Sequence, residues 1–120
     1  MTVTISIIDD KTILLERSGL ITAEQLVTAY QRVLTMKFEY IILDNTNMMY
    51  SVDSIYNADV RPWVRKILQR DELNKVVVIL PEDDELRARV TGSFDEFHVS
   101  EKLIFATCIE SAKITLSKIQ

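Results

Sequence analysis

The sequence predicts one α/β domain over residues 1–120, with a mixed sheet of about five strands, flanked by about four helices, in the order β-β-α-β-α-β-α-β-α. Segments rich in β-branched residues alternate along the chain with segments whose apolar residues recur at helical spacing. The chain has only two glycines and two prolines, which leaves little room for linkers. Strands that alternate with helices form crossovers, and these require parallel neighbours with helices covering the sheet.

The chain opens with a predicted hairpin. Apolar and hydroxyl side chains alternate over residues 2–8, which is typical of a half-buried strand. Residues 9–11 (DDK) have the composition of a turn, and residues 12–17 return as a second strand. Ser18 and Gly19 are expected to end that strand.

A helix and a third strand follow. Thr22 and Gln25 form a predicted capping box at the start of a helix over residues 23–36, which has one apolar face. Residues 39–45 (EYIILDN) are apolar enough for a central strand. Residues 46–52 are expected to form a loop.

The remaining segments continue the alternation. The sequence predicts a helix over 59–70 with Pro62 in a first turn, a strand over 75–80, a helix from Asp83 or Asp84 to Thr91, a strand over Leu103–Ala106, and a helix over Ile109–Ile119.

Composition excludes several classes of function. A net charge of −4 does not suit a protein that binds a nucleic-acid backbone, which needs a basic face. The apolar runs are far shorter than the ~20 residues needed for membrane insertion. A single cysteine excludes an intrachain disulfide. The N-terminus does not resemble a signal peptide, so we expect a cytoplasmic protein.

The sequence contains no convincing catalytic or metal-binding set. Asp9, Asp10 and Asp44 resemble the cation-binding acids of a phospho-receiver domain, but the acid pair is followed by a strand instead of a helix. His98 and Cys108 lie on different predicted elements, and Cys108 is interpreted as a buried core residue. We therefore expect no enzymatic activity, no metal and no cofactor.

The loop after the third strand is the strongest candidate for a binding site. It has the sequence NTNMMYSVDSIY and is unusually rich in large apolar side chains, namely Met48, Met49, Tyr50 and Tyr56. These side chains either fold back onto the core or form a soft apolar surface for a partner or ligand.

Three residues beside this loop complete the candidate site. Asp53 and Ser54 begin the next helix, where a serine could accept a phosphate stabilised by free N–H groups, although both residues are also good helix caps. Trp63 shares a helical stripe with core residues and is expected to pack inside; an exposed Trp63 would instead indicate an interface.

Five stretches of the chain resemble a STAS domain, the fold of anti-sigma-factor antagonists. They also resemble its SpoIIAA-like branch of small stand-alone bacterial proteins. The matching stretches are 19–22 (GLIT), 41–44 (IILD), 76–80 (VVVIL), 86–92 (LRARVTG) and 105–112 (FATCIESA).

The resemblance implies a regulatory module without catalysis. Phosphorylated antagonists carry D-S-S-G after the loop, whereas this chain has Asp53, Ser54, Ile55 and Tyr56 at those positions. The serine that is usually modified is therefore replaced by Ile55. Ser54 remains a possible phosphorylation site.

The leading functional hypothesis is a protein-binding module that uses residues 46–56 and the following helix. The alternative is a carrier or sensor of a small apolar ligand, bound between the sheet and the second helix near Met48, Met49 and Trp63. The surplus of large apolar residues between Met48 and Trp63 also predicts a homodimer.

Overall fold

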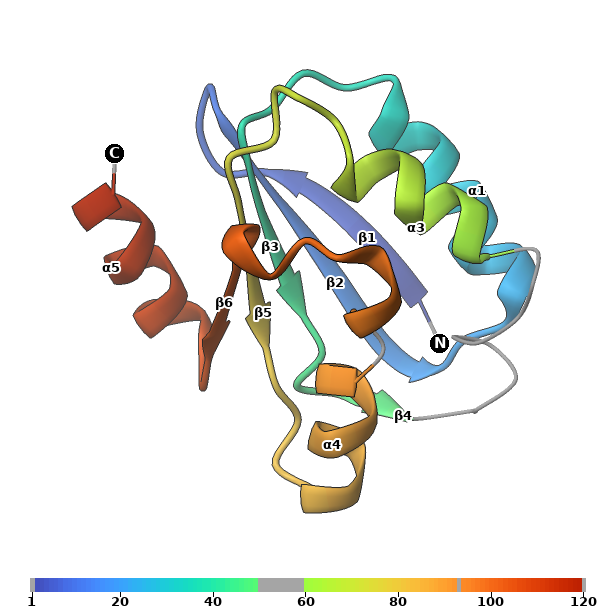
Figure 1. Ribbon diagram of the computed structural model, residues 1–120. Helices are drawn as coiled ribbons and strands as arrows, with labels where there is room; N and C mark the ends of the chain where they lie inside the picture. The colour runs from blue at the N-terminus through green and yellow to red at the C-terminus, as the bar shows by residue number, and fades with distance from the viewer. Residues whose placement is uncertain (1, 50–59, 93, 120) are drawn as a thin grey trace.

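A mixed β-sheet forms the centre of the protein, with helices on both faces (Figure 1). The computed structural model describes residues 2–49, 60–92 and 94–119. The strand order is β1-β2-β3-β5-β6, and a short strand, β4, pairs with the end of β2. The strands are β1 (Thr2–Ile7), β2 (Thr12–Leu20), β3 (Tyr40–Asp44), β4 (Met48–Met49), β5 (Lys75–Ile79) and β6 (Leu103–Ala106).

The predicted hairpin is confirmed. β1 and β2 pair antiparallel, and every other neighbouring pair in the sheet is parallel. The Asp9 carboxylate accepts a hydrogen bond from the backbone N–H of Lys11 at 2.9 Å, which closes the turn between the two strands. That hydrogen bond lowers the pKa of Asp9.

Helices α1 (Ala23–Leu34) and α3 (Arg61–Leu68) cover one face of the sheet (Figure 1). The capping box at Thr22 and Gln25 is present as predicted, and Pro62 lies in the first turn of α3, where its missing N–H costs no helical hydrogen bond. Apolar residues of these helices meet those of β2, β3 and β5 in the larger of two cores.

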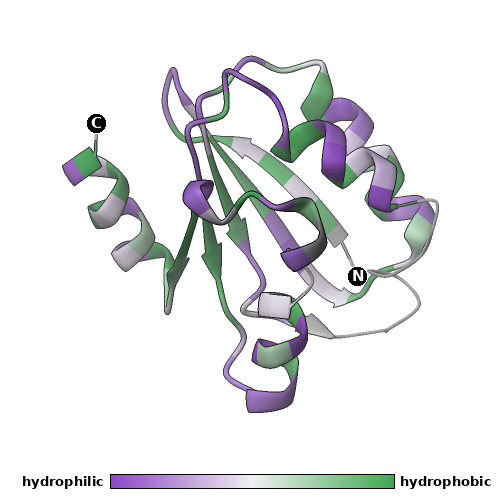
Figure 2. Cartoon of the chain, viewed as in Figure 1, coloured by the Kyte–Doolittle hydropathy of each residue, from purple (hydrophilic) through white to green (hydrophobic). Residues whose placement is uncertain are grey.

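Helix α5 (Ile109–Ile119) covers the opposite face. Ala112 and Leu116 are buried there against Ile42, Val77 and Ile79, which form the smaller core. Because β3 and β5 are buried on both faces, they are apolar apart from Asp44 at the end of β3 and Lys75 at the start of β5, and both are largely green in Figure 2.

Helix α4 (Asp84–Gly92) lies at the end of the molecule where the parallel strands finish (Figure 1). The Asp83 carboxylate accepts a hydrogen bond from the N–H of Leu86 at 2.9 Å, so Asp83 is the N-cap. Two short 3₁₀ helices, η1 (Asp95–Phe97) and η2 (Ser100–Lys102), then lead to β6. Neither was predicted, because each contains a single turn with no periodic pattern.

The structure corrects two expectations about the strands. β2 does not end at Ser18 and Gly19 but continues to Leu20, and part of the predicted 46–52 loop is strand β4. Both differences have one cause: β4 gives the end of β2 a parallel partner, with Gly19 opposite Met48 and Leu20 opposite Met49. Gly19 has a φ of 71°, which its missing Cβ permits.

Candidate functional site

The candidate site lies where β2 stops pairing with β3 and begins to pair with β4. β2 pairs with β3 as far as Glu16 opposite Asp44, and β3 then ends. The Asp44 carboxylate turns the chain by accepting hydrogen bonds from the N–H and the hydroxyl of Thr46, at 2.9 and 2.6 Å. The N–H of Gly19 donates to the carbonyl oxygen of Asn47 at 2.9 Å and joins β2 to the returning chain. Arg17 and Asn45 are the residues that immediately follow the last β2–β3 pair.

Arg17 is a buried cation on the face of β2 that α1 and α3 cover. It continues the inward alternation of Ile13 and Leu15, and only 6% of its surface is exposed. Its Nε donates to Asn45 Oδ1 at 2.7 Å, and its Nη1 donates to the hydroxyl oxygen of Tyr30 at 3.2 Å. No carboxylate among the described residues lies within ion-pair distance of Arg17. Desolvation of such a group costs several kcal/mol, which two neutral hydrogen-bond partners offset only in part.

Asn45 is fully buried and holds Arg17 in place. A guanidinium can only donate hydrogen bonds, so the amide must turn its oxygen toward Arg17 and its Nδ2 away from it. Nδ2 finds no acceptor among the described residues. An unsatisfied buried donor costs about 1–3 kcal/mol, so the arrangement carries a second unfavourable contribution.

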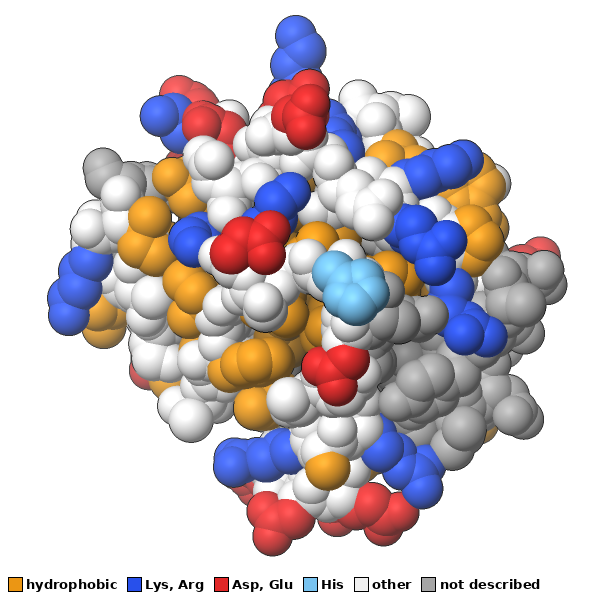
Figure 3. Space-filling view, in the orientation of Figure 1, with side chains coloured by type: hydrophobic (Ala, Val, Ile, Leu, Met, Phe, Trp, Pro, Cys, Tyr) orange, Lys and Arg blue, Asp and Glu red, His pale blue; other side chains and the backbone are white. Residues whose placement is uncertain are grey.

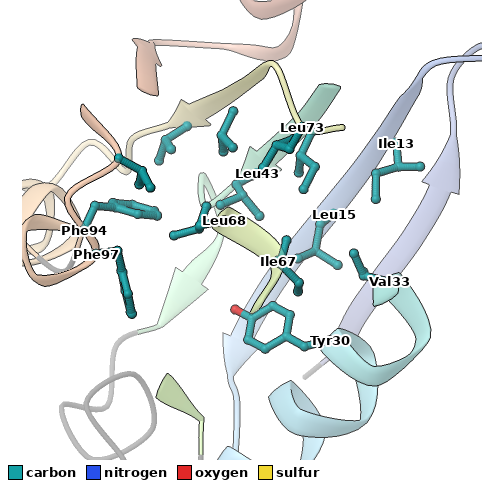
Figure 4. Packing of buried hydrophobic residues seen from close by; sticks show 14 of the residues in the cluster. Ile13, Leu15, Tyr30, Val33, Leu43, Ile67, Leu68, Leu73, Phe94 and Phe97 are labelled. Atoms are coloured by element: carbon teal, nitrogen blue, oxygen red, sulfur yellow. The ribbon is translucent and has the colours of Figure 1, made fainter. Parts of the chain in front are cut away.

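A cavity of about 50 Å³ adjoins Arg17 beneath α3. The described part of its wall comes from β2, β3 and β5, from α1 and α3, and from η1 with the preceding Phe94, and it is mainly apolar. In Figure 4, Tyr30 extends from α1 toward the interior, with Leu15 and Ile67 above its ring and Phe97 on the far side. The cavity therefore combines an apolar wall with two polar groups at one end, the Arg17 guanidinium and the Tyr30 hydroxyl.

The structure describes three of the residues predicted to form the site. Met48 and Met49 are in β4, and Trp63 is half-buried against the larger core, with the ammonium of Lys66 4.6 Å from the centre of its ring. Trp63 is outside the cavity wall, to which α3 contributes Arg61, Val64 and its last two residues. Tyr50, Asp53, Ser54 and Tyr56 lie outside the described residues.

The interpretation of Cys108 as a core residue is wrong. Cys108 is exposed and occupies the N-cap of α5, where its Sγ accepts from the N–H of Ser111 at 3.5 Å. The backbone N–H of Ser111, followed by its hydroxyl, lowers the pKa of the Cys108 thiol. His98 is exposed and ends η1 with a φ of 54°.

The described part of the chain holds neither a metal-binding cluster nor a membrane-spanning helix. No group of three or more His, Cys, Asp or Glu side chains could hold a metal ion there. Within the same residues, no helix is long and apolar enough to cross a bilayer. On the face shown in Figure 3, acidic and basic side chains are interspersed.

Three polar residues that lie together, Arg17, Tyr30 and Asn45, were not predicted from the sequence. One signal was present: in residues 12–17 the inward positions are 13, 15 and 17, and the last of these is an arginine. A charged residue that continues the apolar side of an alternating strand indicates a buried charge. The separation of 28 residues between Arg17 and Asn45 gave no comparable signal.

Comparisons with known proteins identify the fold. No family model matches the chain, and no curated protein sequence matches it. Solved structures do. A Bacillus cell fate determinant, SpoIIAA in its phosphorylated form, aligns over 99% of this chain and 100% of its own length at 12% identity and a TM-score of 0.62. Unphosphorylated SpoIIAA, an anti-sigma factor antagonist, covers 98% of both chains at 11% identity and a TM-score of 0.60.

A third solved structure extends the comparison to another family. It is a Shewanella loihica protein of the DUF3478 family with a SpoIIAA-like fold, which aligns over 96% of this chain and 92% of its own length at 13% identity and a TM-score of 0.66. The strand order, the two helical layers and these full-length alignments agree. The chain therefore has a SpoIIAA-like fold.

Proposed function

We propose that this chain is a non-catalytic regulatory module that binds a protein partner through residues 46–56 and the start of α3. Support comes from its full-length alignment with SpoIIAA, an anti-sigma factor antagonist. An antagonist of a protein factor acts by binding, which requires a stable surface and no reacting groups. The cytoplasm is the compartment in which we expect this module to act.

Strand β4 is the observation that carries the proposal. Its backbone pairs with β2, so the chain at Met48–Met49 has a fixed position beside the end of β2. Leu20, which pairs with Met49, is one of the exposed large apolar residues of the protein. An exposed leucine at the end of β2 offers apolar surface of the kind that binds protein.

The test replaces Met48, Met49 and Tyr50 together by serine and measures unfolding in urea beside the parent. If these side chains serve recognition, the free energy of unfolding should fall by no more than about 0.5 kcal/mol for each exposed position. If they pack on the core, each truncation should cost about 2–5 kcal/mol. A loss of several kcal/mol would therefore contradict the proposed recognition surface.

Asp53→Ala calibrates this measurement. As a predicted helix N-cap, Asp53 should contribute about 1 kcal/mol whether or not the segment binds a partner. Ser54 stays a predicted phosphorylation site. Its modification would add about two negative charges to the predicted helix start and alter any partner surface there.

The cavity supports a second candidate function, the binding of a small molecule between the sheet and α3. A concave, mainly apolar space beside a buried cation is more typical of a ligand site than of a docking surface. Native mass spectrometry of the purified protein tests this, because it reports bound mass and oligomeric state together. A protein that carries no additional mass and gains none from a panel of small acids, amides and alcohols would contradict this candidate.

A further inference from the structure

We propose that the cavity beneath α3 binds a small monocarboxylate, with its two oxygens on the guanidinium of Arg17 and its short carbon chain among the aliphatic side chains of the wall. This inference rests on the second candidate function above and deepens it by naming the chemical class of the ligand. It also replaces the purely apolar ligand expected from the sequence.

Arg17 has N–H groups that find no acceptor among the described residues, and this is the first reason to expect an anionic ligand. A guanidinium has five N–H groups, and the two hydrogen bonds to Asn45 and Tyr30 use two of them, which leaves three without an acceptor among the described residues. Buried charges in proteins are normally paired with an opposite charge. A planar guanidinium matches a carboxylate in a bidentate arrangement, so a bound carboxylate would supply both the charge and the missing acceptors.

The neighbours of Arg17 add to the preference for an acceptor. The Tyr30 hydroxyl oxygen accepts from Arg17, so its own hydrogen is free to donate to a ligand in the cavity that it lines. Asn45 presents a second buried donor close by, its unsatisfied Nδ2. Both neighbours are neutral, and neither compensates the charge of Arg17.

The charged members of the cavity wall among the described residues are both arginines, Arg17 and Arg61, and the other members are apolar apart from Tyr30. Of the two, Arg17 has no carboxylate partner among those residues. In low-dielectric surroundings such a wall favours an anion over a neutral ligand.

Size limits the ligand. At about 10–15 Å³ for each water-sized group, a cavity of about 50 Å³ holds about three to five such groups. A carboxylate with two or three carbons in all fits this space. A phosphate would bring more charge than one guanidinium can match and would gain nothing from an apolar wall.

Propionate is the probe, with propionamide as its neutral counterpart of the same shape. We would titrate each into the full-length protein at pH 7 and constant ionic strength, and follow the NMR signals of the Arg17 Nε–H group and of the Leu15 and Val64 methyl groups. We expect saturable shifts with propionate and a dissociation constant in the millimolar range, because a ligand of few atoms binds weakly. Propionamide should bind at least about tenfold more weakly, because it lacks the charge that pairs with Arg17.

Three variants complete the test. Arg17→Met should abolish propionate binding, whereas Arg32→Met, which removes the same charge from an exposed position on α1, should leave it unchanged. Asn45→Asp keeps Arg17 but sets an internal carboxylate against it, so it should weaken propionate binding by about tenfold or more, even if Arg17→Met does not fold.

Each alternative outcome contradicts a different statement. Equal binding of propionate and propionamide, or binding that survives in Arg17→Met, would overturn the anionic ligand but keep a ligand-binding cavity. Phosphate that binds more tightly than propionate would overturn the carboxylate. No shift in the cavity signals with any probe would overturn both this inference and the second candidate function.

Discussion

Cys108 shows how a single residue can take a role that its usual burial does not suggest. At the N-cap of α5, its Sγ accepts from the N–H of Ser111, while its own N–H donates to the Ser111 hydroxyl at 3.3 Å. This reciprocal pair has the pattern of a capping box in which cysteine replaces serine or threonine. Hydrogen bonds to sulfur favour the thiolate and so lower the pKa of the thiol.

We predict that alkylation of Cys108 by iodoacetamide has a pH–rate midpoint lower in the folded protein than in the chain unfolded in urea. The lowered pKa stabilises the folded state above the pKa of the unfolded thiol, and this contribution disappears as the pH falls through the folded pKa. Ser111→Ala should move the folded midpoint part of the way upward, because it removes the hydroxyl and leaves the N–H. Coincident midpoints for the folded and unfolded protein would contradict this prediction.

At the same scale, the sequence could predict residues whose neighbours along the chain determine their role. Thr22 and Gln25 are three positions apart, and their capping box needs nothing else. Arg17, Tyr30 and Asn45 come together only because three separate elements pack, so no local pattern predicts their contact. Cys108 was misjudged for a different reason: burial statistics for cysteine describe an average, and a helix start can override it.

At the scale of elements, Lys102 connects η2 to the end of α3. Its ammonium donates to the carbonyl oxygens of Leu68 and Arg70 at 2.9 and 3.0 Å. The carbonyls at the end of a helix lack helical partners and carry partial negative charge, so a lysine is well suited to them. A 3₁₀ turn that the sequence did not predict therefore holds the helix that covers the cavity.

We predict that Lys102→Ala lowers the free energy of unfolding by about 1–3 kcal/mol, since it removes charge-assisted hydrogen bonds to partly buried carbonyls. Lys118→Ala is the matched control, because Lys118 is an exposed lysine in the last turn of α5. It should change stability by no more than about 0.5 kcal/mol. Urea unfolding of both variants measures the difference, and equal effects would contradict the role given to Lys102.

The elements themselves were largely predictable, and the exceptions are instructive. β5 and β6 are long enough, and apolar enough, to be recognised from composition. β4 contains two residues and exists only because β2 extends beyond β3 and offers it a partner. Both β4 and the continuation of β2 through Gly19 depend on pairing between segments that are distant in sequence.

For the whole molecule, self-association stays a prediction. Large apolar residues are frequent between Met48 and Trp63, and twofold pairs are the commonest oligomers. We expect sedimentation equilibrium at tens of micromolar, an order of magnitude suited to weak pairs, to give twice the monomer mass of 13.8 kDa. A single species of 13.8 kDa would contradict the dimer.

The order of strands in the sheet has a consequence for how the chain acquires its structure. Along β1-β2-β3-β5-β6 the spatial order repeats the order in sequence, so no strand of this path must insert between two that have already paired. Each new pairing then closes a single connection, whose entropic cost grows only slowly with length. During synthesis from the N-terminus, each strand of this path leaves the ribosome after the strand with which it pairs. The sheet can therefore extend from one edge as synthesis proceeds, with α5 left to cover the last face.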